Sequence, residues 1–369
     1  MNTIIGENYY TGILDDFIIK QDDLNVFNRL ESFIKKYKNH TKLFFISYDL
    51  KNNIENLKSK KKDRINFPIL RCVIPEKKLL KKDFINLKKS ENISIQFKPE
   101  LTKKDYLFKI KKVKSHIQKG DIYETNFCYN WEAYKKINNP YNIFKKLESL
   151  TKAPFSVYSE IGDHVIISAS PERFIKKRGN KLITEPIKGT SKRSRDLDID
   201  QQLINSLKND PKERAENIMI VDLVRNDLSK VANKNSVTVE ELCEVYTFEN
   251  IHQMISKVSC EINKEISFSQ ILKALFPMGS MTGVPKIKAM ELMEKYENSK
   301  RGLYSGAIGV MKPNGDFDLN VVIRTIIYNK ANDCLSFKVG GAITINSQPE
   351  KEYEETLIKA EALLKACQT

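Results

Sequence analysis

The sequence lacks the features that would place a protein in or across a membrane. It has no apolar run of about 18 residues, the length that a membrane-spanning helix requires. Residues 1–10 show no basic stretch followed by an apolar core, so a signal peptide is not indicated. The six cysteines are scattered without a Cys-x-x-Cys pair, which is typical of reduced core thiols in a cytosolic protein. We therefore expect a cytoplasmic protein with no membrane partner.

Signatures of nucleic-acid binding are also absent, although the chain is basic. Its 62 Lys and Arg residues exceed its 47 Asp and Glu residues, which gives a net charge of +15. Such a charge is compatible with binding to nucleic acid. However, the lysines are spread along the whole chain, and neither zinc-finger spacing nor an RNP-type aromatic pattern occurs. We expect no nucleic-acid partner and keep a basic nucleic-acid-binding protein as a remote alternative.

The clearest secondary-structure patterns lie after residue 100. Thr102 is a candidate N-cap for a helix at 102–117, because apolar residues then follow at helical spacing: Tyr106, Ile110, Val113 and Ile117. A second helix is expected at 349–366, at the end of the chain. Between them, a strand expected at 122–131 contains Glu124. Because carboxylates are disfavoured in strands, Glu124 is either an outward-facing residue or a site residue.

The stretch 183–190, Ile-Thr-Glu-Pro-Ile-Lys-Gly-Thr, contains a lysine in an unusual place. It reads as a β-branched strand that ends at Pro186 and enters a tight turn at Gly189. Lys188 lies in that turn, between an isoleucine and a glycine. An apolar setting lowers the pKa of an ammonium group, and a neutral lysine is a nucleophile. The alternative is an ordinary strand end with a surface lysine, and these eight residues leave both open.

Two expected helices each carry a Glu-x-x-Glu pair. The pairs are Glu213 with Glu216, in a helix expected at 200–223 with a break near Asp210, and Glu352 with Glu355, in the helix at 349–366. Like charges three residues apart share a helix face and repel each other unless a cation lies near them. Oxygen ligands of this type suit Mg²⁺, which takes its other ligands from water or an anionic substrate. Exposed surface pairs are the alternative, since such pairs are common.

Other polar residues lie where chemistry is favoured. Glu172 comes just past an expected strand end, as a site residue or as a turn carboxylate. Arg324 lies in the middle of an apolar strand expected at 319–328 and needs an anionic partner if it is buried. The glycine pair at 340–341 allows a close backbone approach. His252 lies in a mostly apolar segment, which favours a core histidine with satisfied hydrogen bonds.

Six motifs occur in a fixed order along the chain. They are Ser-Pro-Glu-Arg-Phe at 170–174, Pro-Ile-Lys-Gly-Thr at 186–190, Glu-Arg-Ala-Glu at 213–216 with Val-Asp-Leu-Val-Arg-Asn-Asp at 221–227, Gly-Ser-Met-Thr-Gly-Val-Pro-Lys at 279–286, Ile-Arg-Thr at 323–325 and Glu-Tyr-Glu-Glu-Thr at 352–356. In this order they resemble the motifs of the chorismate-utilising enzymes. The resemblance implies an α+β fold, an anthranilate-synthase-component-I-like sandwich of two facing β-sheets with helices outside. It also implies a single chorismate-binding domain over 1–369, with a shortened N-terminal part at 1–100 and the catalytic core at 101–369.

Lys188 discriminates between activities within this family. Anthranilate synthases resemble the turn at 186–190 but carry alanine at the position of Lys188, whereas the lysine form resembles aminodeoxychorismate synthase component I. The resemblance implies that Lys188 adds to C2 of the chorismate ring as the C4 hydroxyl leaves. Ammonia then takes C4 and expels the lysine, which gives 4-amino-4-deoxychorismate for 4-aminobenzoate and folate synthesis. Anthranilate synthase component I is the nearest alternative.

The resemblance also implies roles for the other candidate residues. Glu172 would act as a general acid or base, and His252 would help the hydroxyl leave. Mg²⁺ would have two main ligands, with two more glutamates near it or bridged by water: Glu216 and Glu355, then Glu213 and Glu352. Chorismate and its carboxylates would be held by Gly189, Thr190, Tyr304, Arg324, Gly340, Gly341 and Ala342.

The sequence departs from the family pattern at a position that concerns the incoming nucleophile. Relatives that use ammonia usually have glutamine where this chain has Glu124, and relatives that use water have lysine. No Cys-Gly-Leu-Gly-type nucleophile turn of a glutaminase occurs in the sequence. We therefore expect ammonia to come from solution or from a separate glutamine amidotransferase subunit.

Overall fold

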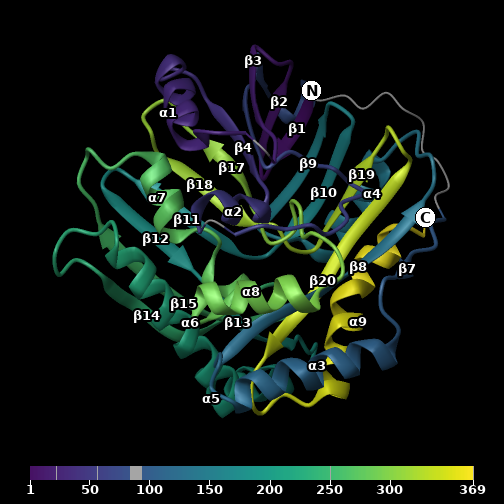
Figure 1. Cartoon of the computed structure of the whole chain (residues 1–369). Helices are drawn as coiled ribbons and strands as arrows, with labels where there is room; N and C mark the ends of the chain where they lie inside the picture. Colours follow the sequence, from purple (N-terminus) through teal and green to yellow (C-terminus); the bar gives the residue numbers. More distant parts are fainter. Residues whose placement is uncertain (22, 56, 84–93, 250, 369) are drawn as a thin grey trace.

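Two antiparallel β-sheets face each other, and helices cover their outer sides (Figure 1). The computed structural model describes residues 1–21, 23–55, 57–83, 94–249 and 251–368. Within these residues each sheet has ten strands. The predicted α+β sandwich with helices outside is confirmed.

The first sheet runs in the order β16-β8-β20-β19-β10-β9-β1-β2-β6, and β7 pairs with β8. Its strands are β1 (Asn2–Ile5), β2 (Asn8–Thr11), β6 (Lys77–Leu79), β7 (Lys98–Pro99), β8 (Glu124–Tyr134), β9 (Phe155–Ile161), β10 (His164–Ser170), β16 (Gly283–Val284), β19 (Thr325–Asn329) and β20 (Cys334–Ile343). Residues from the start of the chain therefore lie in the same sheet as residues from its end.

The second sheet runs in the order β13-β15-β12-β11-β18-β17-β4-β5-β3, and β14 pairs with β15. Its strands are β3 (Asp15–Ile19), β4 (Lys42–Ile46), β5 (Leu70–Ile74), β11 (Arg173–Arg178), β12 (Lys181–Glu185), β13 (Ile187–Lys192), β14 (Thr238–Thr247), β15 (Ile251–Glu261), β17 (Ala307–Met311) and β18 (Phe317–Val321). Residues 1–100 thus contribute strands to both sheets, and their separation from a catalytic core stays a prediction.

The helices follow the apolar patterns of the sequence. They are α1 (Val26–Lys36), α2 (Lys51–Ile54), α3 (Lys103–Gln118), α4 (Tyr141–Thr151), α5 (Leu197–Asn209), α6 (Pro211–Ser229), α7 (Phe268–Leu275), α8 (Lys286–Tyr296) and α9 (Pro349–Ala366), with short 3₁₀ turns η1 (Tyr48–Leu50), η2 (Lys81–Asp83) and η3 (Gly279–Met281). Thr102 caps α3, because its hydroxyl accepts a hydrogen bond from the backbone amide of Asp105. The four apolar residues predicted to face the core from α3 are all buried.

The described residues form four groups of buried apolar side chains, and the three largest hold the layers together. One lies between the sheets and includes Phe45, Ile166 and Ile308. A second joins the first sheet to α3, α4, α8 and α9, and a third joins the second sheet to α1, α6 and α7. Burial of apolar surface is the main favourable term in folding, so these groups fix the sheets and helices that carry the candidate site.

The expected turn after Pro186 is wrong. The chain continues as β13, which pairs with β15, and the register shifts between Ile187 and Thr190. Gly189 lies in this irregular stretch with a φ of +86°, a conformation that glycine adopts without a steric penalty. Lys188 is therefore held on a bulged strand rather than at the tip of a turn.

Two further expectations differ from the structure. The run at 319–328 is two strands in different sheets, β18 and β19, and Arg324 lies in the connection with a φ of +52°. Continuous hydrophobicity alone does not reveal where a chain crosses between sheets. The helix expected at 200–223 does break at Asp210, whose side chain caps α6, but α6 extends beyond residue 223 to Ser229.

Candidate active site

A lysine and a glutamate meet where the two sheets approach each other. Lys188 on β13 belongs to the second sheet, and Glu124 begins β8 of the first sheet. The Lys188 Nζ donates a hydrogen bond to Glu124 Oε1 at 2.8 Å. The two side chains are 11% and 2% exposed, and Glu124 Oε2 has no hydrogen-bond partner among the described residues. Glu124 is thus buried rather than outward-facing, and its role as a site residue stays a prediction.

The charge state of Lys188 differs from the expectation. Burial disfavours the ammonium form, but Glu124, Glu216 and Glu172 together outweigh that effect. The pKa of Lys188 is therefore raised above its ordinary value rather than lowered. The lowered pKa was expected because an isoleucine and a glycine flank Lys188 in the sequence. These neighbours give no information about the carboxylates that other elements place beside its side chain.

Glu172 is a buried carboxyl group close to Lys188. It lies between β10 and β11, and Ser280 of η3 donates a hydrogen bond to its Oε1 at 2.6 Å. The backbone of Ile187 also forms a hydrogen bond with it. Burial nevertheless raises the pKa of Glu172 to about 7, so the group exchanges a proton near neutral pH. Ser280 was not predicted as a site residue, although it lies within the motif at 279–286.

The two Glu-x-x-Glu pairs face each other from α6 and α9. Lys212 Nζ lies 3.9 Å from Glu216 Oε1 and 3.6 Å from Glu352 Oε1, so one ammonium group links the two helices. Lys359 Nζ lies 2.5 Å from Glu355 Oε1 and donates to the backbone oxygen of Gly340 at 2.9 Å. Both cations relieve repulsion between the carboxylates.

The carboxylate oxygens of these glutamates are suitable ligands for Mg²⁺, but the ammonium groups of Lys212 and Lys359 lie beside them. Oxygen donors are the ligands that Mg²⁺ prefers, and one or two carboxylates suffice when a substrate supplies the rest. Burial raises the pKa of Glu216 to about 7, which indicates that it lacks a sufficient positive partner. Among the described residues, no group of three acidic, histidine or cysteine side chains is close enough to hold a metal alone. A metal ion bound here would need further ligands from outside the described residues.

The predicted glycines have different surroundings. A Cβ added to Gly189 would lie 3.1 Å from Glu213 Oε2, so this glycine lets α6 approach β13. A Cβ on Gly340 would clash with the backbone oxygen of Phe127 in the neighbouring strand β8. A Cβ on Gly341 would lie 3.8–3.9 Å from the side chains of Glu352, Lys359 and Glu355. Gly341 therefore faces the carboxylates, whereas Gly340 allows close packing. Ala342 is half-buried and Thr190 is exposed.

Arg324 carries a charge that the described residues do not neutralise. No carboxylate oxygen of the described chain lies within 4.0 Å of its guanidinium, which donates only to the backbone oxygen of Lys359 at 3.4 Å. Burial lowers its pKa, and Tyr304 and Glu355 are the charged or titratable groups that act on it. Arg324 is half-buried, and withdrawing a guanidinium from water without a carboxylate partner is costly, so Arg324 is suited to a carboxylate ligand.

His252 has the surroundings of a satisfied core histidine. Its ring is fully buried on β15, and both ring nitrogens form hydrogen bonds at 2.9 Å, with Asp200 Oδ1 and with Thr247 Oγ1. The interpretation from the residues alone is confirmed. As arranged, the ring has no nitrogen left for a substrate hydroxyl, and its role in the departure of that hydroxyl stays a prediction.

Comparison with known proteins identifies the family. A sequence profile described as chorismate binding enzyme matches residues 79–365. The chain belongs to the chorismate binding enzyme family. Among curated relatives, aminodeoxychorismate synthase component 1 of Escherichia coli is 34% identical over 299 residues, which cover 78% of this chain and 65% of that protein. Anthranilate synthase component 1 of Aquifex aeolicus is 35% identical over 283 residues, which cover 77% and 57%.

Solved structures agree with this family assignment at the level of the fold. Anthranilate synthase component I from Streptococcus pneumoniae superimposes with a TM-score of 0.83 at 24% identity, covering 99% of this chain and 92% of that one. The chain spans less than two thirds of the length of the two curated chorismate binding relatives named above. In the part of the chain that the structure describes, no helix has the length and apolar character needed to cross a bilayer.

Proposed function

We propose that this protein converts chorismate and ammonia to 4-amino-4-deoxychorismate, as an aminodeoxychorismate synthase component I. The observation that carries the proposal is Lys188, a buried lysine placed among three acidic side chains on a bulged strand. Relatives named aminodeoxychorismate synthase component 1 in Escherichia coli and Bacillus subtilis support it, at 34% and 37% identity. The product would serve 4-aminobenzoate and folate synthesis, in the cytoplasm.

Chorismate is a dicarboxylate, and the site offers matching positive charge. Arg324 would bind one carboxylate, because its guanidinium lacks an acidic partner and donates parallel hydrogen bonds. Tyr304 lies close enough to Arg324 to influence its pKa and would contact the same end of the substrate. Gly341 leaves room beside Glu352 and Glu355, while Gly189, Thr190, Gly340 and Ala342 would supply backbone around the ring.

The first chemical step must remove a proton from Lys188. Its raised pKa keeps it as ammonium, so Glu124 would accept the proton through the existing hydrogen bond. The freed Nζ then forms a bond to C2, both ring double bonds shift (C1=C2 to C1=C6, and C5=C6 to C4=C5), and the bond between C4 and its hydroxyl oxygen breaks. Glu172, with a pKa of about 7, would give a proton to the leaving hydroxyl, which departs as water.

The second step replaces the lysine by ammonia. Ammonia forms a bond to C4, both ring double bonds shift back to C5=C6 and C1=C2, and the bond between C2 and Nζ breaks. The neutral Lys188 regains a proton from Glu124, and the ammonium group formed at C4 loses one to Glu172. The balance is chorismate plus ammonia giving aminodeoxychorismate plus water. Each residue ends in its starting protonation state.

Magnesium and a second subunit complete the proposal. Mg²⁺ would be held by Glu216 and Glu355, with Glu213 and Glu352 nearby, and would offset the charge of a substrate carboxylate. Lys212 and Lys359 would then move off these carboxylates. The names of the relatives, component 1, support a partner component, and a glutamine amidotransferase would supply the ammonia.

Product identification tests this proposal directly. The protein is incubated with chorismate, Mg²⁺ and ammonium chloride, which replaces the amidotransferase, and products are separated by chromatography with mass detection. Aminodeoxychorismate supports the proposal. Anthranilate would favour anthranilate synthase component I, the activity named for the relative from Aquifex aeolicus. Unchanged chorismate would contradict both.

A further inference from the structure

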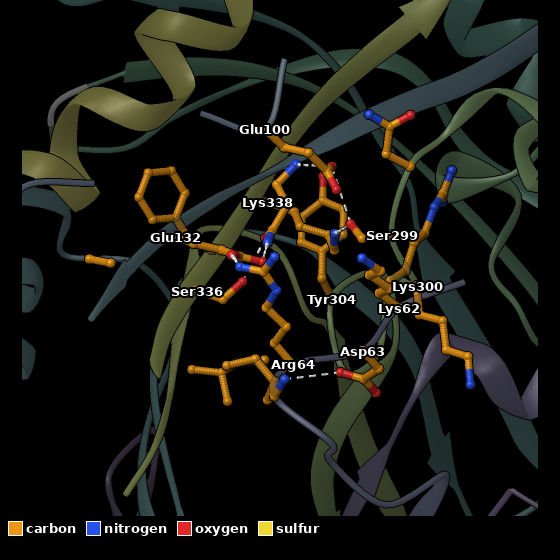
Figure 2. A pocket seen from close by; sticks show the side chains of 18 of the residues that line it. Lys62, Asp63, Arg64, Glu100, Glu132, Ser299, Lys300, Tyr304, Ser336 and Lys338 are labelled. Carbon is orange, nitrogen blue, oxygen red and sulfur yellow. Dashed lines mark hydrogen bonds and ion pairs between the residues drawn. The ribbon is translucent and has the colours of Figure 1, made fainter. Parts of the chain in front are cut away.

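A cavity of about 640 Å³ lies apart from the Lys188 cluster. Its walls come from β8, β19 and β20 of the first sheet and from the segments 62–65 and 298–304 (Figure 2). Of the predicted site residues, only Tyr304 lines it. The candidate active site therefore does not account for this space.

The cavity lining has more basic than acidic side chains. The basic ones are Lys62, Arg64, Lys98, Lys300, Arg301 and Lys338, and the acidic ones are Asp63, Glu100 and Glu132. Arg64 is paired with Glu132 at 2.5 Å, and Arg301 is paired at 2.7 Å with Glu297, which does not line the cavity. The remaining side chains leave a positive excess, and a positive cleft attracts anions.

Lys338 is the buried cation of this lining. It is 6% exposed, and its Nζ donates to Ser299 Oγ at 2.6 Å. Ser299 in turn donates to Glu100 at 3.2 Å (Figure 2). No carboxylate oxygen of the described residues lies within 4.0 Å of the Lys338 ammonium, which has three N–H donors. Buried charges are normally paired, so this ammonium can take a direct anionic partner.

The rest of the wall is apolar and buried. Leu303, Ile327 and Phe337 line the cavity, and each is less than 9% exposed. The Tyr304 ring is buried beside them. A bare inorganic anion would leave these surfaces uncovered, whereas a carboxylate with an apolar body would use both parts of the wall.

We propose that this cavity binds a small organic carboxylate, whose carboxylate accepts hydrogen bonds from Lys338 while its apolar body packs against Leu303, Ile327 and Phe337. The exposed Lys62 and Lys98 lie at the rim and attract the anion. The proposal goes beyond chorismate conversion and does not depend on it, because Lys188 and its carboxylates take no part.

The fluorescence of a single tryptophan can report ligand binding to this cavity. Trp131 is the only tryptophan in the sequence, and its neighbours on β8, Asn130 and Glu132, line the cavity. Its ring also stacks on Phe337, with centroids 5.7 Å apart. Titration with benzoate, followed by Trp131 fluorescence and by calorimetry, should show saturable binding. Inorganic phosphate and the neutral analogue benzamide, at matched ionic strength, should bind at least tenfold more weakly.

Substitution of lysines inside and outside the cavity tests whether benzoate binds there. Lys338→Met should weaken benzoate binding at least tenfold, about 1.4 kcal/mol, whereas Lys338→Arg should retain it. Lys312→Met removes an exposed lysine outside the cavity and should bind as the wild type does. Circular dichroism and thermal unfolding confirm that each variant is folded.

Several results would overturn the proposal. These are the absence of saturable fluorescence and heat changes with the wild type, equal binding of phosphate, and unchanged affinity in Lys338→Met. Loss of benzoate binding in Arg324→Ala, with normal binding in Lys338→Met, would place the ligand in the candidate active site instead. Chorismate turnover is measured separately, so failure here is distinguishable from failure of the proposed function.

Discussion

Lys188 and Glu124 form a buried ion pair that joins the second sheet to the first, with 2.8 Å between Nζ and Oε1. The proposed reaction requires a neutral, nucleophilic Lys188, whereas the raised pKa keeps this lysine charged. A lysine that remains charged requires a base within hydrogen-bond reach, and Glu124 is already in place. In the proposed reaction Glu124 would act as this base, which a neutral glutamine at the same position could not do.

Replacing Glu124 should change the charge of its partner. Because Glu124 raises the pKa of Lys188, Glu124→Gln should lower that pKa, and more neutral lysine will be present at any given pH. The pH dependence of Lys188 labelling by a small amine-reactive reagent, read by mass spectrometry, should shift to lower pH. Glu132→Gln, on the same strand, serves as the control. An unchanged midpoint would show that Glu124 does not set the charge of Lys188.

Glu172 should give the reaction a pH dependence near neutrality. As the acid that protonates the leaving hydroxyl it must carry a proton, so kcat should fall as pH rises through about 7. Glu172→Gln should lower kcat about a hundredfold or more and remove this dependence. Ser280→Ala removes a hydrogen bond that lowers the pKa, so the fall in kcat should move to higher pH. The assays are run at constant free ammonia, and a Ser280→Ala profile identical to wild type would count against this role.

The glutamates of α6 and α9 should control magnesium binding. Glu216→Gln and Glu355→Gln should each abolish turnover and weaken Mg²⁺ binding measured by calorimetry, because each removes a charged oxygen ligand. Glu354→Gln changes an exposed neighbour on α9 and should leave both properties unchanged. A chelator should stop the reaction and added Mg²⁺ should restore it. Full activity in the chelator would exclude the metal role.

Arg324 should act on substrate affinity. Arg324→Lys keeps the charge but loses the parallel hydrogen bonds of the guanidinium, so the KM for chorismate should rise about tenfold, equivalent to about 1.4 kcal/mol. Steady-state kinetics at saturating ammonia measures the change. If KM stays at the wild-type value, Arg324 shapes the connection between β18 and β19 without binding substrate.

Patterns within one element were predicted well from the sequence. The periodic apolar residues and Thr102 located α3 to within one residue, and α9 begins and ends at the expected positions. These patterns are local, because the residues that define them are neighbours on one helix. The Glu-x-x-Glu pairs were found for the same reason.

Contacts between distant elements were not predictable in this way. Glu124 and Lys188 are 64 residues apart, and Ser280 is 108 residues from Glu172. The apolar neighbours of Lys188 suggested a depressed pKa, whereas carboxylates from other elements raise it. Likewise, the apolar run around Arg324 concealed a crossing between sheets, because both strands that flank it are buried.

The most direct test of the central claim is mass spectrometry of the enzyme quenched during reaction with chorismate and Mg²⁺ in the absence of ammonia. We expect a covalent adduct on the peptide that contains Lys188, lost in Lys188→Ala together with at least about a hundredfold of aminodeoxychorismate formation. Lys192→Ala, an exposed lysine on the same strand, should keep both adduct and turnover. Absence of an adduct on the wild type, with unchanged turnover in Lys188→Ala, would contradict the account and leave Lys188 as a structural partner of Glu124.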